Sequence, residues 1–403
     1  MVIGGGLVLL GVEGFKPEKQ LTSTTLFDLL KIAFAVVAGL GALVALVVAY
    51  RRQKVAESAQ WLAELADDRA ADAARREATK LHNERFASAA GQLGHDSAAV
   101  RLAGAHALAG LADDAPTREL RQTCIDVLCA YLRIPYSPQP SDDAPEAERL
   151  AFAGLREVRH TVIRLISAHL RKNAAFSWQG HDFDLTGVLF DGGDFAEIVF
   201  SDGKFDFTGA VFNGGVVNFS GAEFSGGQVI FYRANFLGGS VGFTGCKFSG
   251  GTVSFTLAEF CGAKLYFGDS RFSESEVSFR GAVFSEGSIS FEALEISGGA
   301  INFAGAEFSG SNIHFHGSTL SGGHVAFNHS VLSGGKIDFH WAKFSGCEFD
   351  FNFAKFQGTV VDLRDARDYS VPPKGLPNPA PEGLKLPTRT NGSLKGPEGS
   401  LPS

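Results

Sequence analysis

Phenylalanine occupies every twelfth position from Phe207 to Phe351, thirteen times in succession. Five residues after each one stands another large apolar residue, and two residues before the next one stands a Val, Ile, Leu or Phe. Spacings of two predict strands, because side chains alternate between faces in a strand, whereas a helix needs spacings of three and four. The repeated residues are therefore expected to form the interior of a fold built from short strands.

Small residues separate the apolar positions of the unit, which reads V-x-F-x-x-A-x-F-S-G-G-x. Glycine permits positive φ and close stacking, so the Gly pairs are expected to form corners between walls. They are not expected to bind phosphate, because the strand-then-helix context of a nucleotide motif is missing.

The number of residues in one coil follows from volume. A coil of twelve residues has only two short walls and cannot hold two columns of rings beside a Val column, whereas a coil of 24 has four walls. Each residue should therefore stack on the one 24 positions later, in a rod on the order of 30 Å long. The ladder expected inside this rod includes Phe207, Phe212, Val217, Phe219, Phe224, Phe231, Phe236, Phe243, Phe248 and Phe255.

The first part of the repeat region resembles the pentapeptide-repeat family, whose unit is A-x-[LF]-x-x. Leu185, Phe190, Phe195 and Phe200 follow one another at intervals of five, and would make one ordinary coil. The later units look like two pentapeptides with a two-residue insertion. The resemblance implies a right-handed quadrilateral β-helix, with one end covered by the helical segment that ends near Ala175 and the other end exposed or paired.

A membrane-spanning helix is predicted near the N-terminus. The run from Ile32 to Tyr50 is 19 residues without a charge and reaches roughly 28 Å as a helix, about the thickness of the hydrocarbon core. Lys31 precedes it, paired with Asp28 on one helical face, and Arg51, Arg52 and Lys54 follow it. A basic cluster after a span favours a cytoplasmic location for that end, so the bulk of the chain is expected in the cytoplasm.

The remaining segments complete an α+β multi-domain chain. Arg51 to Ala90 predicts a long helix without Gly or Pro, a solvated stalk or a weak coiled coil. Two amphipathic helices and a third from Glu146 to Arg171 predict a HEAT-like module. The expected parts are 1–25, an N-terminal segment that is interfacial or part of an earlier span; 26–50, the transmembrane helix; 51–90, the juxtamembrane helix; 91–175, the helical module; 181–369, the β-helix; and 370–403, a disordered tail rich in Pro and Gly.

No constellation of side chains predicts catalysis, a cofactor or a metal centre. Five cysteines form no CxxC pair, and Cys246 stands where neighbouring repeats have Ala, so a small buried side chain is expected there. His316 and His340 are 24 residues apart and should stack on adjacent coils, with His314 beside Asp338. A metal site at these histidines is the less favoured interpretation, because a third ligand is not obvious.

Charge and the wider resemblance bear on function. The chain has a net charge of −8; between Asp182 and Asp368 it has 22 acidic and 11 basic residues, a local net of −11, which leaves +3 elsewhere.

The motifs "ALVVAYRRQ", "GQLGHDSAAVRLAGAHALAGLADD" and "VLCAYLRIPY" with the repeats resemble actinobacterial membrane-associated pentapeptide-repeat proteins. This resemblance implies an architecture and does not imply a chemical activity.

Two functions are therefore open, and neither is enzymatic. The first is a scaffold on the membrane, anchored by one span, that presents the β-helix to unknown protein partners in the cytoplasm. The second is an acidic rod that mimics DNA and acts on a nucleic-acid enzyme such as gyrase; neither binds nucleic acid directly or takes a small-molecule substrate.

Overall fold

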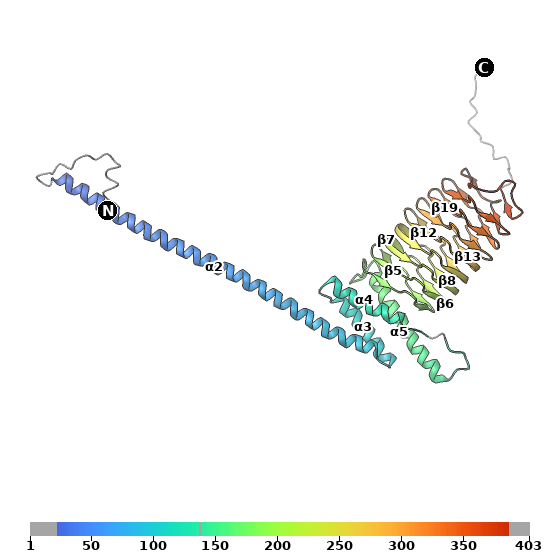
Figure 1. Cartoon of the computed structure of the whole chain (residues 1–403), viewed down its shortest axis with the longest axis horizontal. Coiled ribbons are helices and arrows are strands. Elements are labelled where there is room, and N and C mark those ends of the chain that lie inside the picture. Colours follow the sequence, from blue (N-terminus) through green and yellow to red (C-terminus); the bar gives the residue numbers. More distant parts are fainter. Residues whose placement is uncertain (1–21, 137–138, 387–403) are drawn as a thin grey trace, which may run out of the picture. The chain divides into compact units, whose positions relative to one another are not determined.

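The computed structural model describes residues 22–136 and 139–386, which form helices at the N-terminal side and a parallel β-solenoid after them (Figure 1). The chain divides into two compact units, residues 1–78 and 79–403. The predicted N-terminal segment 1–25 lies almost entirely outside the described residues.

Helix α2 (Ser23–Leu93) runs without interruption for 71 residues, through both the predicted transmembrane segment and the predicted juxtamembrane segment. Its second half is rich in Ala, Glu, Arg and Leu, which have high helix propensity. The helix ends before Gly94, whose N–H donates to the carbonyl of Ala90.

The helical module contains α3 (Ala98–Asp113), α4 (Arg118–Arg133) and α5 (Glu146–Leu170), together with the last turns of α2. Thr117 caps α4, since its hydroxyl accepts a hydrogen bond from Leu120 N at 3.3 Å. At Gly104 the backbones of α3 and α2 approach so closely that a Cβ would lie 2.4 Å from Leu93 N. The buried side chains of this module join those of the solenoid in one hydrophobic core.

Two long parallel sheets form the walls of the solenoid. The first contains β1 (Phe183–Asp184), β4 (Val199–Phe200), β5 (Lys204–Asp206), β7 (Glu223–Ile230), β9 (Lys247–Ser254), β11 (Arg271–Phe272), β12 (Glu276–Ser278), β14 (Glu295–Ile296), β15 (Ala300–Asn302), β18 (Thr319–Leu320), β19 (His324–Ala326), β22 (Lys343–Phe344), β23 (Glu348–Asp350) and β26 (Asp368–Tyr369). The second contains β2 (Leu189–Phe190), β3 (Gly193–Asp194), β6 (Val211–Asn218), β8 (Asn235–Gly242), β10 (Glu259–Tyr266), β13 (Val283–Ser290), β16 (Glu307–Phe308), β17 (Asn312–His314), β20 (Val331–Leu332), β21 (Lys336–Asp338), β24 (Lys355–Phe356), β25 (Val360–Asp362) and β27 (Leu384–Lys385).

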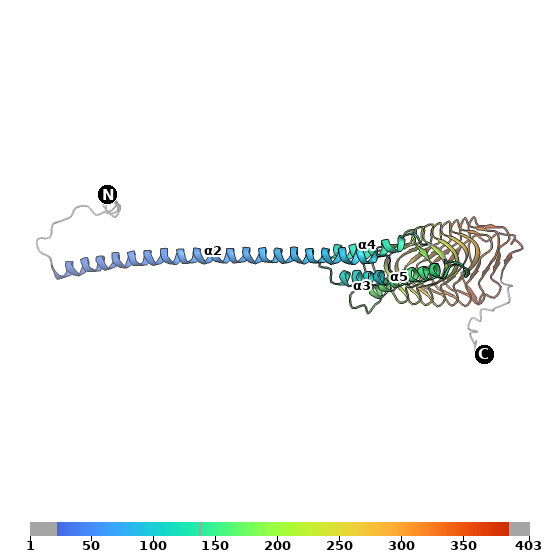
Figure 2. The ribbon, with the colours of Figure 1, turned by 90° about the horizontal axis from the view of Figure 1, so that it is seen from below.

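The register confirms the predicted coil of 24 residues. Phe212 pairs with Phe236, and Phe236 pairs with Phe260. The first coil is shorter, because Phe183 pairs with Phe205 and Phe190 with Phe212, both 22 residues apart. One wall position is occupied at eight successive levels by Phe183, Phe205, Val229, Val253, Val277, Ile301, Val325 and Phe349. Figure 2 shows the resulting stack of coils.

The four-residue turn after each inner Phe holds a corner together. The N–H of Ala210 donates to the carbonyl of Phe207 at 2.9 Å, and Gly209, the second of the two residues between them, has φ +64°. The small residue that ends this turn, Ala210 in this unit, is buried inside the corner. In other units Ser or Cys takes this place, and its side chain donates a hydrogen bond to a backbone carbonyl. Ser270 Oγ donates to Phe243 O at 2.7 Å, and Cys246 Sγ donates to Phe219 O at 3.0 Å.

Both ends of the solenoid carry additional chain. Helices α4 and α5 pack on β1 and β3 of the first coil. At the other end, the boundary predicted for the disordered tail at residue 370 is wrong. Residues 370–386 lie on the last coil, with β27 paired in parallel with β25 and Leu384 buried. An unpaired sheet edge leaves backbone N–H and C=O groups without hydrogen-bond partners. Residues 370–386 provide such partners for the last coil. Residues 387–403 lie outside the described residues.

Candidate interaction surfaces

All ten residues of the predicted ladder point into the solenoid, and each has at most 2% of its surface exposed. Phe207 and Phe231 stack at 4.6 Å between ring centroids, and Phe219 and Phe243 at 5.0 Å. Consecutive units meet edge to face instead, as Phe219 and Phe231 do at 6.4 Å and 90°. These rings form the core, so any binding surface of the solenoid consists of the residues between them.

The apolar part of α2 is long and apolar enough to cross a membrane, and none of its most apolar 18-residue window is buried within the structure. Lys31 Nζ lies 3.1 Å from Asp28 Oδ1, so the predicted pair before the span is present. Arg51, Arg52 and Lys54 follow the span on the exposed helix. The helix therefore presents an exposed apolar surface of the length that crossing a bilayer requires.

The outer walls carry charged side chains that pair between successive coils. Arg271 Nε lies 2.8 Å from Glu295 Oε2, and Lys247 Nζ lies 3.9 Å from Glu223 Oε2. Such exposed pairs contribute little to stability. Their main effect is to place charged groups on the outer walls. Hydrogen bonds from Arg364 lower the pKa of Asp362 to about 2, although burial opposes the shift.

The predicted histidine pair is present on the C-terminal coils. The rings of His316 and His340 stack at 5.2 Å, and His314 lies opposite Asp338 in the register of β17 and β21. His340 Nδ1 and Asp365 Oδ2 are 3.2 Å apart. Among residues 22–136 and 139–386, no group of three or more His, Cys, Asp or Glu side chains is arranged to hold a metal ion.

A polar cluster that the sequence did not reveal joins the helical module to the first coil. Asp191 Oδ1 lies 2.9 Å from His160 Nε2, and Asp191 Oδ2 accepts from Tyr136 OH at 2.9 Å and from Arg156 Nε at 2.8 Å. Burial raises the pKa of Asp191, but the hydrogen bonds from His160, Tyr136 and Arg156 outweigh it and hold that pKa well below its usual range. The ionised Asp191 carboxylate therefore holds the first coil to the helical module.

Arg159 strengthens the same junction from a buried position. Its guanidinium donates to Leu132 O at 2.8 Å and to Leu189 O at 2.9 Å, and it lies over the Tyr136 ring at 4.4 Å from the centroid. A single side chain therefore links α4, α5 and β2. Removing it would leave two carbonyls without donors in a poorly solvated site.

A second polar cluster surrounds Asp113 at the end of α3. Trp178 Nε1 donates to Asp113 Oδ1 at 2.9 Å, and His169 Nε2 lies 3.1 Å from Asp113 Oδ2. The rings of His169 and Trp178 stack at 4.0 Å. The buried Trp178 lies in the segment between α5 and β1, so this cluster fixes the chain where the helical module leads into the solenoid.

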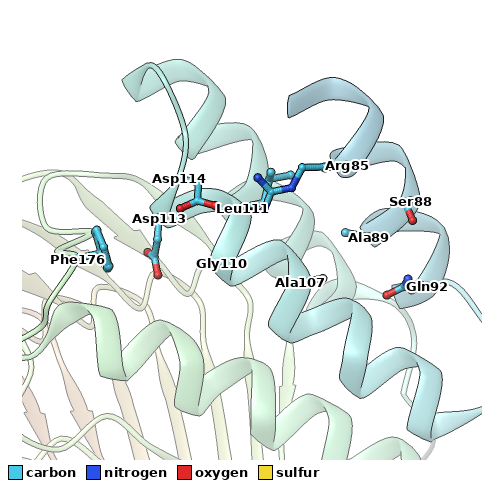
Figure 3. Close-up of a pocket in the computed structure, with 10 residues that line it drawn as sticks. All are labelled: Arg85, Ser88, Ala89, Gln92, Ala107, Gly110, Leu111, Asp113, Asp114 and Phe176. Atoms are coloured by element: carbon cyan, nitrogen blue, oxygen red, sulfur yellow. Dashed lines mark hydrogen bonds and ion pairs between the residues drawn. The ribbon is translucent and has the colours of Figure 1, made fainter. Parts of the chain in front are cut away.

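A groove of about 480 Å³ lies beside this second cluster, between the end of α2 and the end of α3 (Figure 3). Arg85 points across it to Asp114, with 3.1 Å between Nη2 and Oδ2. Leu111 and Ala89, both buried, contribute apolar side chains to its lining, and the exposed Phe176 lies at one end. Asp113 accepts from Trp178 and Asp114 pairs with Arg85, so both carboxylates that line the groove already have partners within the chain.

Four of the five cysteines are buried, and Cys261 is exposed. Cys246 is fully buried, as expected from its place in the repeat, and burial raises the pKa of its thiol to about 12. Burial raises the pKa of Cys124 to about 11 and that of Cys347 to about 12. A thiol needs a lowered pKa to act as a nucleophile at neutral pH, so these three are inert.

Comparison with known proteins gives no assignment, because no family model, curated protein or solved structure matches the chain.

Proposed function

We propose that the chain is a non-enzymatic scaffold, anchored in a membrane by α2, that presents a pentapeptide-repeat β-helix to protein partners in the cytoplasm. The observation that carries this proposal is the division of the repeat into buried and exposed positions. The recurring Phe, Val and Ala residues fill the interior, and the residues that vary from unit to unit face outward. A rigid framework with a variable surface is typical of solenoids that bind proteins.

The spacing within the first coil supports the pentapeptide-repeat assignment. Leu185, Phe190, Phe195 and Phe200 are five residues apart, and all four are buried. A quadrilateral coil with one inward residue per wall has this spacing. The 24-residue coils then correspond to four such walls with two insertions of two residues.

The location of the scaffold depends on the charges beside the span. Arg51, Arg52 and Lys54 follow the apolar segment directly, and a cluster of this kind is retained on the cytoplasmic side. The helical module and the solenoid come after this cluster in the chain. Both would therefore lie on the cytoplasmic side.

The net charge of −11 between Asp182 and Asp368 favours a second function, that of an acidic rod acting on a nucleic-acid enzyme such as gyrase. The apolar surface of α2 argues against it, because a protein held at a membrane would meet such an enzyme less often. The two functions predict different partners.

Proximity labelling in cells, from a labelling enzyme fused to the C-terminus of the full chain, distinguishes these possibilities. The scaffold predicts a reproducible set of membrane-associated cytoplasmic proteins. Charge reversal on one exposed wall, by Glu259→Lys with Glu307→Lys, should remove members of this set, whereas Glu57→Lys on α2 is the matched control. Labelling outside the cytoplasm would contradict the orientation, and a DNA enzyme as the main neighbour would favour the second function.

A further inference from the structure

The last turns of α2 contact the helical module through few buried side chains. Helix α2 lies wholly within the described residues, and three of its 71 residues are buried: His82, Ala89 and Leu93. All three follow residue 78, where the chain divides into its two compact units. Ala89 and Leu93 are apolar, whereas His82 can take up a proton. A titratable group therefore occupies one of the few buried positions that hold this end of α2.

The surroundings of His82 do not favour a positive charge. Its Nε2 lies 4.0 Å from Sγ of the fully buried Cys124 on α4. Arg85 lies one turn later on α2, and the Asp114 carboxylate already pairs with it. Burial lowers the pKa of His82 below its ordinary value of 6.5, the Arg85 guanidinium lowers that pKa further, and Asp114 opposes both effects only in part. His82 is therefore neutral in the folded protein at neutral pH.

The contact between α2 and α3 is incomplete one turn after His82. The groove of about 480 Å³ lies between residues 85–92 of α2 and residues 107–114 at the end of α3 (Figure 3). Side chains that line a gap lose packing contacts, so this stretch holds the two helices together less tightly than a close-packed interface would. The helices meet closely only farther on, where a Cβ on Gly104 would lie 2.4 Å from Leu93 N. Because few groups hold this end of α2, the charge of one of them has a large effect on the contact.

We propose that His82 makes the junction between α2 and the helical module sensitive to acid. With His82 neutral, residues 82–93 pack against α3 and α4. Protonation places a charge against the buried Cys124 and beside Arg85, and residues 82–93 then swing away about the connection at residues 94–97. The module and the solenoid keep their fold, and only the attachment of α2 loosens. This inference does not depend on the proposed scaffold function.

The pH range of this opening differs from that of the Asp191 cluster. Because the folded pKa of His82 lies below its unfolded pKa, neutral His82 stabilises the packed form at pH values above the unfolded pKa. This contribution is lost as the pH falls through the folded pKa. One proton changes the ratio of opened to packed forms by at most about tenfold per pH unit. Asp191 titrates in a more acidic range, since its pKa lies below that of an ordinary carboxyl group.

The cysteines report this opening in the full chain in detergent. Cys124 contacts His82, whereas Cys129 lies farther along α4 and Cys347 lies in the solenoid, and all three are buried. Dithiodipyridine modifies accessible thiols in mild acid, and the exposed Cys261 gives the intrinsic rate of this reagent at each pH. From about pH 7.5 to about pH 5, the labelling rate of Cys124 relative to Cys261 should rise roughly three- to tenfold, while Cys129 and Cys347 stay unlabelled by peptide mass spectrometry.

Two substitutions separate the effect of His82 from a general effect of acid. His82→Leu removes the proton acceptor and should abolish the rise at Cys124. His106→Leu removes an exposed histidine of α3 and should leave that rise unchanged. A rise that persists in His82→Leu would belong to another group, such as the buried His181, and would overturn the proposal.

The unmodified chain decides the question even if His82→Leu does not fold. A Cys124 rate that stays constant relative to Cys261 across this pH range would overturn the proposal. Equal labelling of Cys124 and Cys129 in acid would also overturn it, because the whole helical module would then unfold. Labelling of Cys124 alone supports an opening at α2.

Discussion

The ring of Phe255 lies 4.5 Å from that of Phe231 in the preceding coil, and the two planes differ by 3°. Phe279 in the following coil stacks on its other face at 4.8 Å. Phe255→Ala would leave a ring-sized cavity in a column that cannot collapse, because the coils are held apart by hydrogen bonds between strands. We expect a loss of about 3 to 5 kcal/mol in the free energy of unfolding, measured by denaturant unfolding followed by circular dichroism.

Phe353 provides the matched control for this substitution. Its side chain has 76% of its surface exposed and φ is +62°. Phe353→Ala should change the free energy of unfolding by less than about 0.5 kcal/mol, as exposed substitutions usually do. Equal effects of the two substitutions would contradict the placement of Phe255 in the core.

The second turn of each unit provides another pair of matched substitutions. Gly298 and Gly238 occupy the same position of the repeat, and neither has a positive φ. A Cβ on Gly298 would lie 2.0 Å from the carbonyl oxygen of Ser273, whereas a Cβ on Gly238 would meet nothing within 4 Å. Gly298→Ala should therefore lower the thermal midpoint, and Gly238→Ala should leave it unchanged or raise it slightly. The reverse order would show that the coils adjust at this corner.

The ladder and the length of the coil could be predicted from the sequence because both depend on a single periodic constraint. A residue that recurs every twelve positions through thirteen units must occupy an equivalent site in each unit, and the volume of the rings then requires four walls. Burial of the ladder residues and their pairing across 24 positions follow from that constraint alone.

The clusters around Asp191 and Asp113 could not be predicted in the same way. Tyr136, Arg156, His160 and Asp191 come from three places in the chain, and of these four only Arg156 and His160, which are four residues apart on α5, are related by a helical spacing. They meet because the helices pack on one irregular coil that occurs once. The contacts of Trp341 with His316 and Arg367 could not be predicted either, because they depend on how the chain is wound.

The strand formed within residues 370–386 was missed for a related reason. Its Pro-rich composition is typical of disorder, but Leu384 reaches the open edge of the last coil and is buried there. The composition of a segment shows whether the segment can form a hydrophobic core by itself. It does not show whether the segment can pair with the open edge of a neighbouring sheet.

Acid should weaken the attachment of the helical module to the solenoid. The pKa of Asp191 lies below its unfolded value, so its ionised form stabilises the folded state at pH values above that unfolded pKa, about 4. This contribution is lost as the pH falls through the lowered pKa. We expect Asp191→Asn to cost about 1 to 3 kcal/mol at pH 7 and progressively less below pH 4, by thermal unfolding across this range.

Asp365→Asn is the control for this acid dependence, because the Asp365 side chain is 60% exposed and lies on the C-terminal coils. Its thermal unfolding should follow that of the unmodified chain at each pH. An Asp191→Asn variant with the full acid dependence of the unmodified chain would show that other carboxylates govern it.

The apolar segment of α2 can be tested by placing a charge within it. Val44 lies near the middle of the segment and is 62% exposed. Val44→Arg should cost about 2.5 to 3.5 kcal/mol of insertion free energy and shift the chain from the membrane pellet to the supernatant after alkaline extraction. Leu62→Arg places the same charge on the same helix beyond Lys54 and should leave the distribution unchanged. Extraction of the unmodified chain by alkali would rule out integration.

The five cysteines should differ sharply in reactivity. Cys261 is exposed, whereas Cys124, Cys129, Cys246 and Cys347 are buried. With its pKa raised to about 12, the Cys246 thiol is ionised in only about one molecule in ten thousand at pH 8, and reagents cannot reach it. Iodoacetamide at pH 8 should therefore add one label to the folded chain and five to the unfolded chain, counted by mass spectrometry. Cys261→Ser should remove the single label; a second rapid label on the folded chain would show that a corner of the solenoid opens in solution.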